Sequence, residues 1–180
     1  MSKKNDVDEE TQEEFQDDAP VSPEGDDSLS ELNFDVTDEY KPDPLVSSGT
    51  YHGVATKITF EPQKFCIVWS FCLHDNDGVM SDGETPVDGS YVYYRNWLPK
   101  PGDEDVMSKD GKKTKRQTKI NMLMDFQKNL NIDISTPSII SEGLADQIWI
   151  GVEADLEVVI DEWQGRFRNS VNKISASKMF

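Results

Sequence analysis

The segment Tyr91–Trp97 holds three tyrosines, one arginine and one tryptophan in seven positions. Side chains alternate along a β-strand, so a regular strand would place Tyr91, Tyr93, Arg95 and Trp97 on one face. Aromatic rings on which bases stack, set among cations that contact phosphates, are typical of single-stranded nucleic-acid binding. We therefore take Tyr91, Tyr93, Tyr94 and Trp97 as candidate stacking residues and Arg95 as a candidate phosphate contact. The alternative left open is that aromatics are common in strands and half of them face the core.

A second group of cations follows closely. Within eleven positions lie Lys109, Lys112, Lys113, Lys115, Arg116 and Lys119, interrupted only by Asp110. Such a cluster can engage phosphates and release their counterions, and a helix N-terminus adds partial positive charge. The nucleic-acid-binding residues predicted here are Lys112, Lys113, Lys115, Arg116 and Lys119, joined near the C-terminus by Arg166 and Arg168. A solvated loop is the alternative reading of the lysines.

The sequence offers little for catalysis or metal binding. Its two histidines, His52 and His74, stand in no recognisable nucleophile motif. Cys66, Cys72 and His74 lack the paired spacing that zinc sites use. We expect no catalytic residue, no metal and no cofactor, and therefore no enzyme.

The formal net charge of −17 is concentrated at one end of the chain. Residues 1–44 hold 16 Asp/Glu and 3 Lys/Arg, whereas residues 45–180 hold 19 and 15. Because the first segment has few apolar residues to offset its ordering entropy, we predict a disordered acidic tail over residues 1–47. Residues 48–176 would form the folded domain, and residues 177–180 a C-terminal tail. The acidic tail could compete with nucleic acid for the cations, recruit basic partner proteins, or only keep the chain soluble.

The order of the expected elements points to one fold. Candidate strands cover Gly49–Phe60, Lys64–His74 and Tyr91–Trp97; a helix covers Arg116–Asn129; two further strands cover Gln147–Asp161 and Arg166–Ile174. A mainly β chain with five strands and one helix between strands three and four has the element order of an OB-fold barrel. Such barrels bind oligonucleotides or oligosaccharides across strands two and three.

Hydrophobic alternation predicts which face of each strand is buried. In the first strand the inward set contains Val54, Ile58 and Phe60. In the second strand it is Phe65, Ile67, Trp69, Phe71 and Leu73. In the fourth it is Ile148, Ile150, Val152, Ala154, Leu156, Val158 and Ile160. In the last strand Arg166, Arg168 and Ser170 share the face opposite Phe167 and Val171.

Over residues 48–175 the chain resembles a bacteriophage family of small OB-fold single-stranded DNA-binding proteins, long described as of unknown function. The resemblance rests on the order of short motifs: Gly49-Thr50-Tyr51, the strand that contains Trp69, Asn96-Trp97-Leu98, Leu130-Asn131-Ile132, Gly143-Leu144 before strand four, and Arg168-Asn169-Ser170-Val171. The chain departs at its C-terminus, where Ser177–Phe180 contains no acidic residue. Many single-stranded DNA-binding proteins end instead in an acidic, aromatic-tipped tail that docks partners.

The resemblance implies a non-catalytic, largely sequence-independent single-stranded DNA-binding protein of phage DNA replication and recombination, acting in the host cytoplasm. Replication or recombination proteins would be further partners, reached through the acidic tail. The alternative is a protein-interaction adaptor of the replication machinery whose acidic arm mimics DNA. We expect no membrane association, because no apolar run approaches the length of a span. Oligomeric state stays open.

Overall fold

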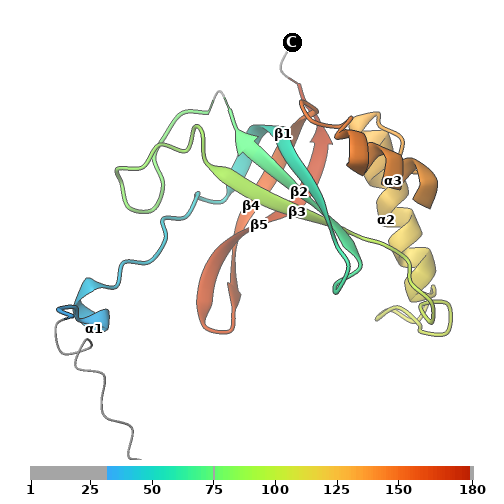
Figure 1. Ribbon diagram of the computed structural model, residues 1–180, viewed down its shortest axis with the longest axis horizontal. Coiled ribbons are helices and arrows are strands. Elements are labelled where there is room, and N and C mark those ends of the chain that lie inside the picture. Colours follow the sequence, from blue (N-terminus) through green and yellow to red (C-terminus); the bar gives the residue numbers. More distant parts are fainter. Residues whose placement is uncertain (1–31, 75, 179–180) are drawn as a thin grey trace, which may run out of the picture. The chain divides into compact units, whose positions relative to one another are not determined.

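The computed structural model describes residues 32–74 and 76–178 (Figure 1). The chain divides into two units, Met1–Lys41 and Pro42–Phe180. In the described part of the first unit lies the single-turn helix α1 (Val36–Glu39), which begins at Asp35, whose side chain accepts from the backbone N–H groups of Thr37 and Asp38. The second unit contains β1 (Gly49–Glu61), β2 (Cys66–Leu73), β3 (Tyr91–Trp97), α2 (Lys115–Leu130), α3 (Pro137–Asp146), β4 (Glu153–Trp163) and β5 (Arg166–Ala176).

The five strands form one antiparallel sheet in the order β3-β2-β1-β4-β5. This confirms the expectation of a mainly β chain with five strands. The sheet curls, and in Figure 1 β4 and β5 pass behind β2 and β3. The edge strands β3 and β5 contact each other. The sheet is not closed, since within the described residues no hydrogen-bonded ladder joins β3 to β5.

A bulge in β1 decides which of its side chains are buried. Ala55 pairs with Phe71 and Lys57 with Ser70, so Thr56 is an extra residue in the ladder. One extra residue moves every later side chain to the other face. Ala55 is therefore buried and Val54 is not, which makes the prediction of an inward Val54 wrong. Ile58 is buried as predicted.

The core lies on the inner face of β2. Ile67, Trp69, Phe71 and Leu73 are fully buried, as their alternation predicts. The Trp69 ring contacts the rings of Phe126 (centroid distance 4.9 Å) and Trp149 (5.7 Å). Phe65 departs from the prediction, because it has a φ of 56° in the β1–β2 turn and is only half-buried.

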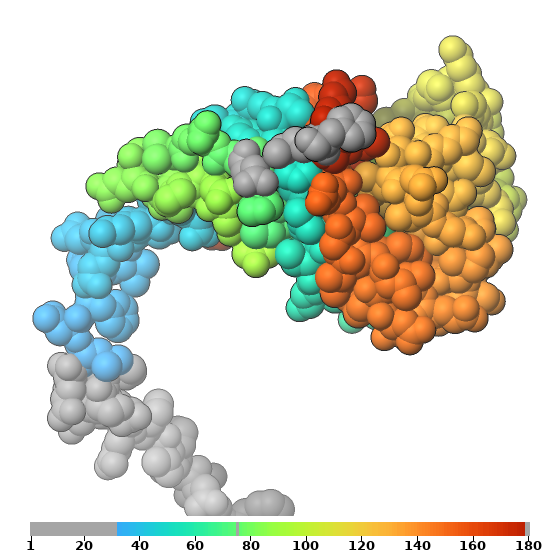
Figure 2. Space-filling view, turned by 90° about the horizontal axis from the view of Figure 1, so that it is seen from above, coloured from blue at the N-terminus to red at the C-terminus, as the bar shows by residue number. Residues whose placement is uncertain are grey.

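Helix α2 has well-defined ends close to the predicted ones. The Thr114 side chain accepts a hydrogen bond from Gln117 N–H, and Asn131 ends the helix in the left-handed conformation (φ 50°). The helix buries Phe126 and Leu130 against the sheet. In Figure 2 the helices and the loop before them, yellow to orange, form a lobe beside the strands.

A second helix, α3, precedes β4, although the sequence predicted only one helix. Thr136 caps it and Pro137 occupies its first turn. Left-handed Gln147 (φ 52°) ends it, and a turn follows up to Gly151. The predicted strand from Gln147 is therefore wrong in its first six residues, and Ile148 and Ile150 are exposed in the turn.

Gly143 lies within α3, not in a segment that leads directly into a strand. A Cβ at this position would overlap the six-membered ring of Trp149, which is buried against Trp69. Alanine normally stabilises a helix by about 0.5–1 kcal/mol over glycine. Here overpacking reverses the sign, and we expect Gly143→Ala to destabilise the fold by about 1–3 kcal/mol in urea unfolding. Glu142→Ala, at the exposed neighbouring position, should leave the unfolding midpoint almost unchanged; equal midpoints for both variants would contradict the packing.

The folded unit begins before β1. Val46 is buried, its N–H donates to the Asn169 side chain (2.8 Å), and its carbonyl accepts from the Asn169 amide (2.7 Å). Leu45 exchanges hydrogen bonds with Ser81. These two residues, which we expected in the tail, are thus fixed to the β2–β3 connection and to β5. Residues 1–31 of the predicted disordered tail and the C-terminal Phe180 lie outside the described residues.

Candidate nucleic-acid interface

The outer face of β3 carries exposed aromatic side chains, and we call Tyr91, Tyr93, Arg95 and Trp97 the aromatic row. Tyr91, Tyr93 and Trp97 are 55%, 52% and 41% exposed, whereas the intervening Val92 and Asn96 are buried. The strand pairs with β2 without a register shift, so the alternation is unbroken. The prediction that these four residues share a face is therefore confirmed.

Tyr94 lies on the opposite, inner face of β3. Its ring stacks on Phe126 with a centroid distance of 5.4 Å and an interplanar angle of 2°. Burial raises the pKa of its hydroxyl. This ring is part of the core and is not placed to stack on a base.

A shallow hollow of about 290 Å³ adjoins Trp97, and we call it the lysine hollow. It is lined by Lys64, Trp97, Lys100, Lys115, Thr118, Lys119 and Met122. Sequence reasoning missed Lys64 and Lys100 because each stands alone rather than in a run. The available signal was their position: Lys64 lies just before β2 and Lys100 just after β3. Residues at the ends of strands that form a binding face can contact the same ligand.

Lys119, predicted to contact phosphate, is buried in an ion pair. Its Nζ donates to Asp103 Oδ2 (2.7 Å) and to the Leu98 carbonyl (2.9 Å). Asp103 is also buried and accepts from the Lys100 backbone N–H (3.0 Å). The Lys119 hydrogen bond is the main cause that holds the pKa of Asp103 below its usual range. Lys119 thus fastens the loop before α2 to the end of β3, and its charge is neutralised.

The remaining members of the cluster are differently placed. Lys115 Nζ lies 3.8 Å from Asp103 Oδ1 and also lines the lysine hollow. Lys112 and Lys113 are exposed in a turn closed by backbone hydrogen bonds between Ser108 and Lys113 and between Gly111 and Ser108. Arg116 faces a different cavity, an apolar cleft next to α3. The structure therefore divides the lysine-rich segment among an ion pair, a turn and two cavities.

One acidic residue stands between the aromatic row and the lysine hollow. Glu61 accepts from Lys64 Nζ (3.0 Å) and lies 3.9 Å from Arg95 Nη2. The Lys64 hydrogen bond is the main cause that lowers the pKa of Glu61. Glu61 holds both cations at the rim but offsets part of their charge, which leaves Lys100 as a rim lysine whose ammonium has no ion pair among the described residues.

Arg166 and Arg168 lie on the β4–β5 hairpin. Arg168 stands over the Trp163 ring, 5.3 Å from its centroid. Trp163 is exposed and was missed because it follows the predicted end of the strand. Phe167, on the other face of β5 as predicted, is exposed as well, since the hairpin extends beyond the core. Because β5 contacts β3, this hairpin is a second aromatic and basic element on the same curled sheet.

His52 is buried among polar groups, but their geometry is unlike that of a catalytic triad. Its Nδ1 lies 3.1 Å from Ser177 Oγ and 3.7 Å from Asp155 Oδ1. A triad needs the hydroxyl and a hydrogen-bonded carboxylate on different ring nitrogens. Here Asp155 approaches the same nitrogen as Ser177, and Glu153 Oε2 lies 3.9 Å from Nε2, beyond hydrogen-bond distance. Across the part of the chain that the structure describes, no group of three His, Cys, Asp or Glu residues is placed to hold a metal ion.

No protein-family model matches the chain, and no curated protein matches it.

None of the helices in the described residues is long and apolar enough to cross a membrane.

Proposed function

We propose that this chain is a non-catalytic single-stranded DNA-binding protein that binds through the aromatic row and the lysine hollow. The observation that carries the proposal is the position of Trp97, which belongs to both. A strand that stacks on Tyr91, Tyr93 and Trp97 would continue into a hollow whose rim carries lysine ammonium groups. Bases need flat apolar surfaces and phosphates need cations, and Trp97 joins the two.

The row has a spacing that suits nucleotides. Successive residues of one strand face stand about 6.6 Å apart, roughly twice the 3.4 Å rise of stacked bases. Each ring can therefore meet one base of an extended strand. Contacts made to base faces and phosphates carry no sequence code, so binding would be largely independent of sequence.

The proposed OB-fold and the proposed role in phage DNA replication or recombination rest on the order of the elements and on the resemblance described above. A curled five-stranded antiparallel sheet with helical structure between β3 and β4 is compatible with an OB-fold, which binds ligands across strands two and three. Protection of single strands during phage replication or recombination in the host cytoplasm is the role we propose. The acidic N-terminal segment would compete for the cations or engage partner proteins.

The test is the fluorescence anisotropy of a labelled oligo-dT, titrated with the full chain and with a chain that begins at Leu45. The truncation keeps the bonds of Leu45 and Val46 to Ser81 and Asn169. We expect both proteins to bind, the shorter one more tightly, and both to bind less tightly as salt increases. For single strands, the logarithm of the binding constant plotted against the logarithm of the salt concentration has a slope of about −0.7 per phosphate contact. Lys100→Ala should flatten that slope by about this amount. Lys128→Ala, an exposed lysine on the last turn of α2, is the control.

No binding by either protein at low salt would refute the proposal. The adaptor alternative would then stand, and a protein partner of the acidic arm would be the object of the search. Binding with an unchanged slope in Lys100→Ala would keep the function but move the phosphate path away from the lysine hollow.

A further inference from the structure

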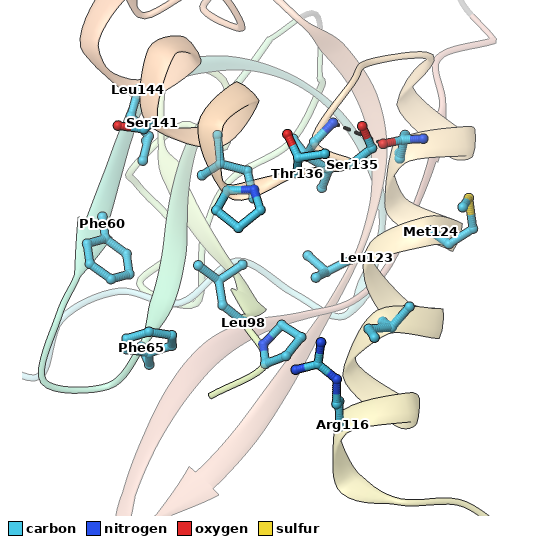
Figure 3. A pocket seen from close by; sticks show the side chains of 16 residues that line it. Phe60, Phe65, Leu98, Arg116, Leu123, Met124, Ser135, Thr136, Ser141 and Leu144 are labelled. Carbon is cyan, nitrogen blue, oxygen red and sulfur yellow. Dashed lines mark hydrogen bonds between the residues drawn. The ribbon is translucent and has the colours of Figure 1, made fainter. Parts of the chain in front are cut away.

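The second unit contains an apolar cleft that the proposed DNA path does not use (Figure 3). Its volume is about 610 Å³. The strand side contributes Phe60, Phe65 and Leu98, and α2 contributes Leu123 and Ile120. Phe60 and Phe65 meet edge to face, with ring centroids 5.7 Å apart. Open apolar surface of this kind typically marks a binding site for protein.

Charge at the cleft has one sign. Among the described residues that line it, Arg116 alone is charged, and Figure 3 shows it at the end of the cleft nearest the start of α2. Lys112 and Lys113 are exposed a few residues earlier in the chain. An occupant that complements the cleft would combine large apolar side chains with carboxylates.

The chain itself contains such a segment, Leu32–Tyr40, which we call the α1 segment. Leu32, Phe34, Val36 and Tyr40 are 57%, 64%, 71% and 69% exposed. Val36 and Tyr40 are four apart across the helical turn, so they share a side. Asp35, Asp38 and Glu39 supply the carboxylates.

The turn is already ordered locally. The Asp35 carboxylate accepts from Thr37 and Asp38 N–H (2.8 and 3.1 Å), and Glu39 Oε1 accepts from Asp35 N–H (3.0 Å). These reciprocal bonds resemble a capping box, with Glu39 one position later than the usual third residue, and such ordering lowers the entropy lost when a short helix docks. An apolar face presented by a helical turn is a common way to fill a hydrophobic groove.

The cleft and the anchor of the α1 segment lie at opposite ends of β1. Val46 is fixed just before Gly49 at the start of the strand, whereas Phe60 stands at its end. The eleven residue steps between Gly49 and Phe60 cover about 36 Å of strand. The six residue steps from Tyr40 to Val46 span at most about 22 Å. This tether favours the cleft of a neighbouring molecule over the cleft of the same chain.

We propose that the α1 segment of one copy docks in the apolar cleft of a second copy, with its carboxylates facing Arg116. Each copy then contributes its α1 segment to one neighbour and its cleft to another. The contact is therefore heterologous and extends into a head-to-tail row instead of a closed pair. The proposal is independent of DNA binding.

Sedimentation velocity of the full chain without DNA tests it. We expect the average mass to rise with concentration beyond that of a dimer. The double substitution Phe34→Ser with Val36→Ser removes the donor, and Ile120→Glu blocks the acceptor. Both sites are exposed or at the cleft surface, so the fold is retained. Each variant alone should lose self-association by more than about tenfold. Ile148→Ser, exposed and outside the cleft, should associate like the wild type.

A mixture of the two variants is decisive. The donor-deficient copy keeps its cleft and the acceptor-deficient copy keeps its α1 segment, so the mixture should form dimers that grow no further. A wild-type chain that stays monomeric at every concentration overturns the proposal, whether the segment folds back or binds another protein. Association that survives both substitutions, or a mixture that stays monomeric, overturns it equally.

Discussion

Replacing Tyr93 and Trp97 together by alanine is expected to weaken oligo-dT binding by about 2–6 kcal/mol, because each stacked base contributes about 1–3 kcal/mol. Each single variant should lose about 1–3 kcal/mol. Both rings are roughly half exposed on the outer face of β3, so neither supports the core and the unfolding midpoint should change little. Anisotropy titrations at one fixed salt concentration measure the loss.

Tyr94→Phe is the matched control on the same strand. Its ring stacks on Phe126 inside the core, and the substitution keeps that ring. We expect unchanged affinity in this variant. If the double variant Tyr93→Ala with Trp97→Ala binds like the wild type, the aromatic row is not the DNA path, even when the protein binds DNA.

Replacing Lys119 by methionine is expected to lower the melting temperature by roughly 10 °C, since it leaves a buried carboxylate without its cation. Asp103 would keep only the Lys100 N–H and the more distant Lys115. Lys115→Met is the control: that lysine is exposed and 3.8 Å from the carboxylate, so its removal should shift the melting temperature by little. Equal shifts for the two variants would contradict the buried pair.

The same ion pair has a predictable pH dependence. The Lys119 hydrogen bond lowers the pKa of Asp103 in the folded state below its ordinary value of 3.8. A carboxyl whose folded pKa is depressed stabilises the fold fully above its unfolded pKa and loses that contribution as the pH falls through the folded one. The difference in melting temperature between wild type and Lys119→Met should thus be largest above pH 3.8 and shrink below it. A difference that grows on acidification would exclude this pair as its source.

Where the hydrophobic pattern was unbroken, the sequence predicted the structure. The inner face of β2, the shared face of Tyr91, Tyr93, Arg95 and Trp97, and the approximate extent of α2 followed from alternation and from the spacing of apolar residues. Phe60 and Ile160, also predicted to face inward, are 40% and 42% exposed near the ends of their strands. Two other errors have a local cause. A bulge at Thr56 leaves no mark in the pattern, so Val54 was assigned to the wrong face. The alternation of Ile148, Ile150 and Val152 imitates a strand, although Gln147 and Gly151 have positive φ.

The candidate site was harder to predict than the fold. The aromatic row is local in sequence and could be read from it. The role of Lys119 depends on Asp103, which is sixteen residues away, and the lysine hollow joins Lys64, Lys100 and Lys115 from three separate segments. Such contacts depend on tertiary packing, which a run of like charges does not reveal.

The four tryptophans divide into two pairs by environment. Trp69 and Trp149 contact each other in the core, while Trp97 and Trp163 are exposed on the sheet. The intrinsic emission of the protein is therefore a sum of a short-wavelength band from indoles in an apolar setting and a long-wavelength band from hydrated ones. The short-wavelength band serves as an internal standard. A change confined to the long-wavelength band shows that a ligand or partner covers Trp97 or Trp163, and the measurement needs no attached label.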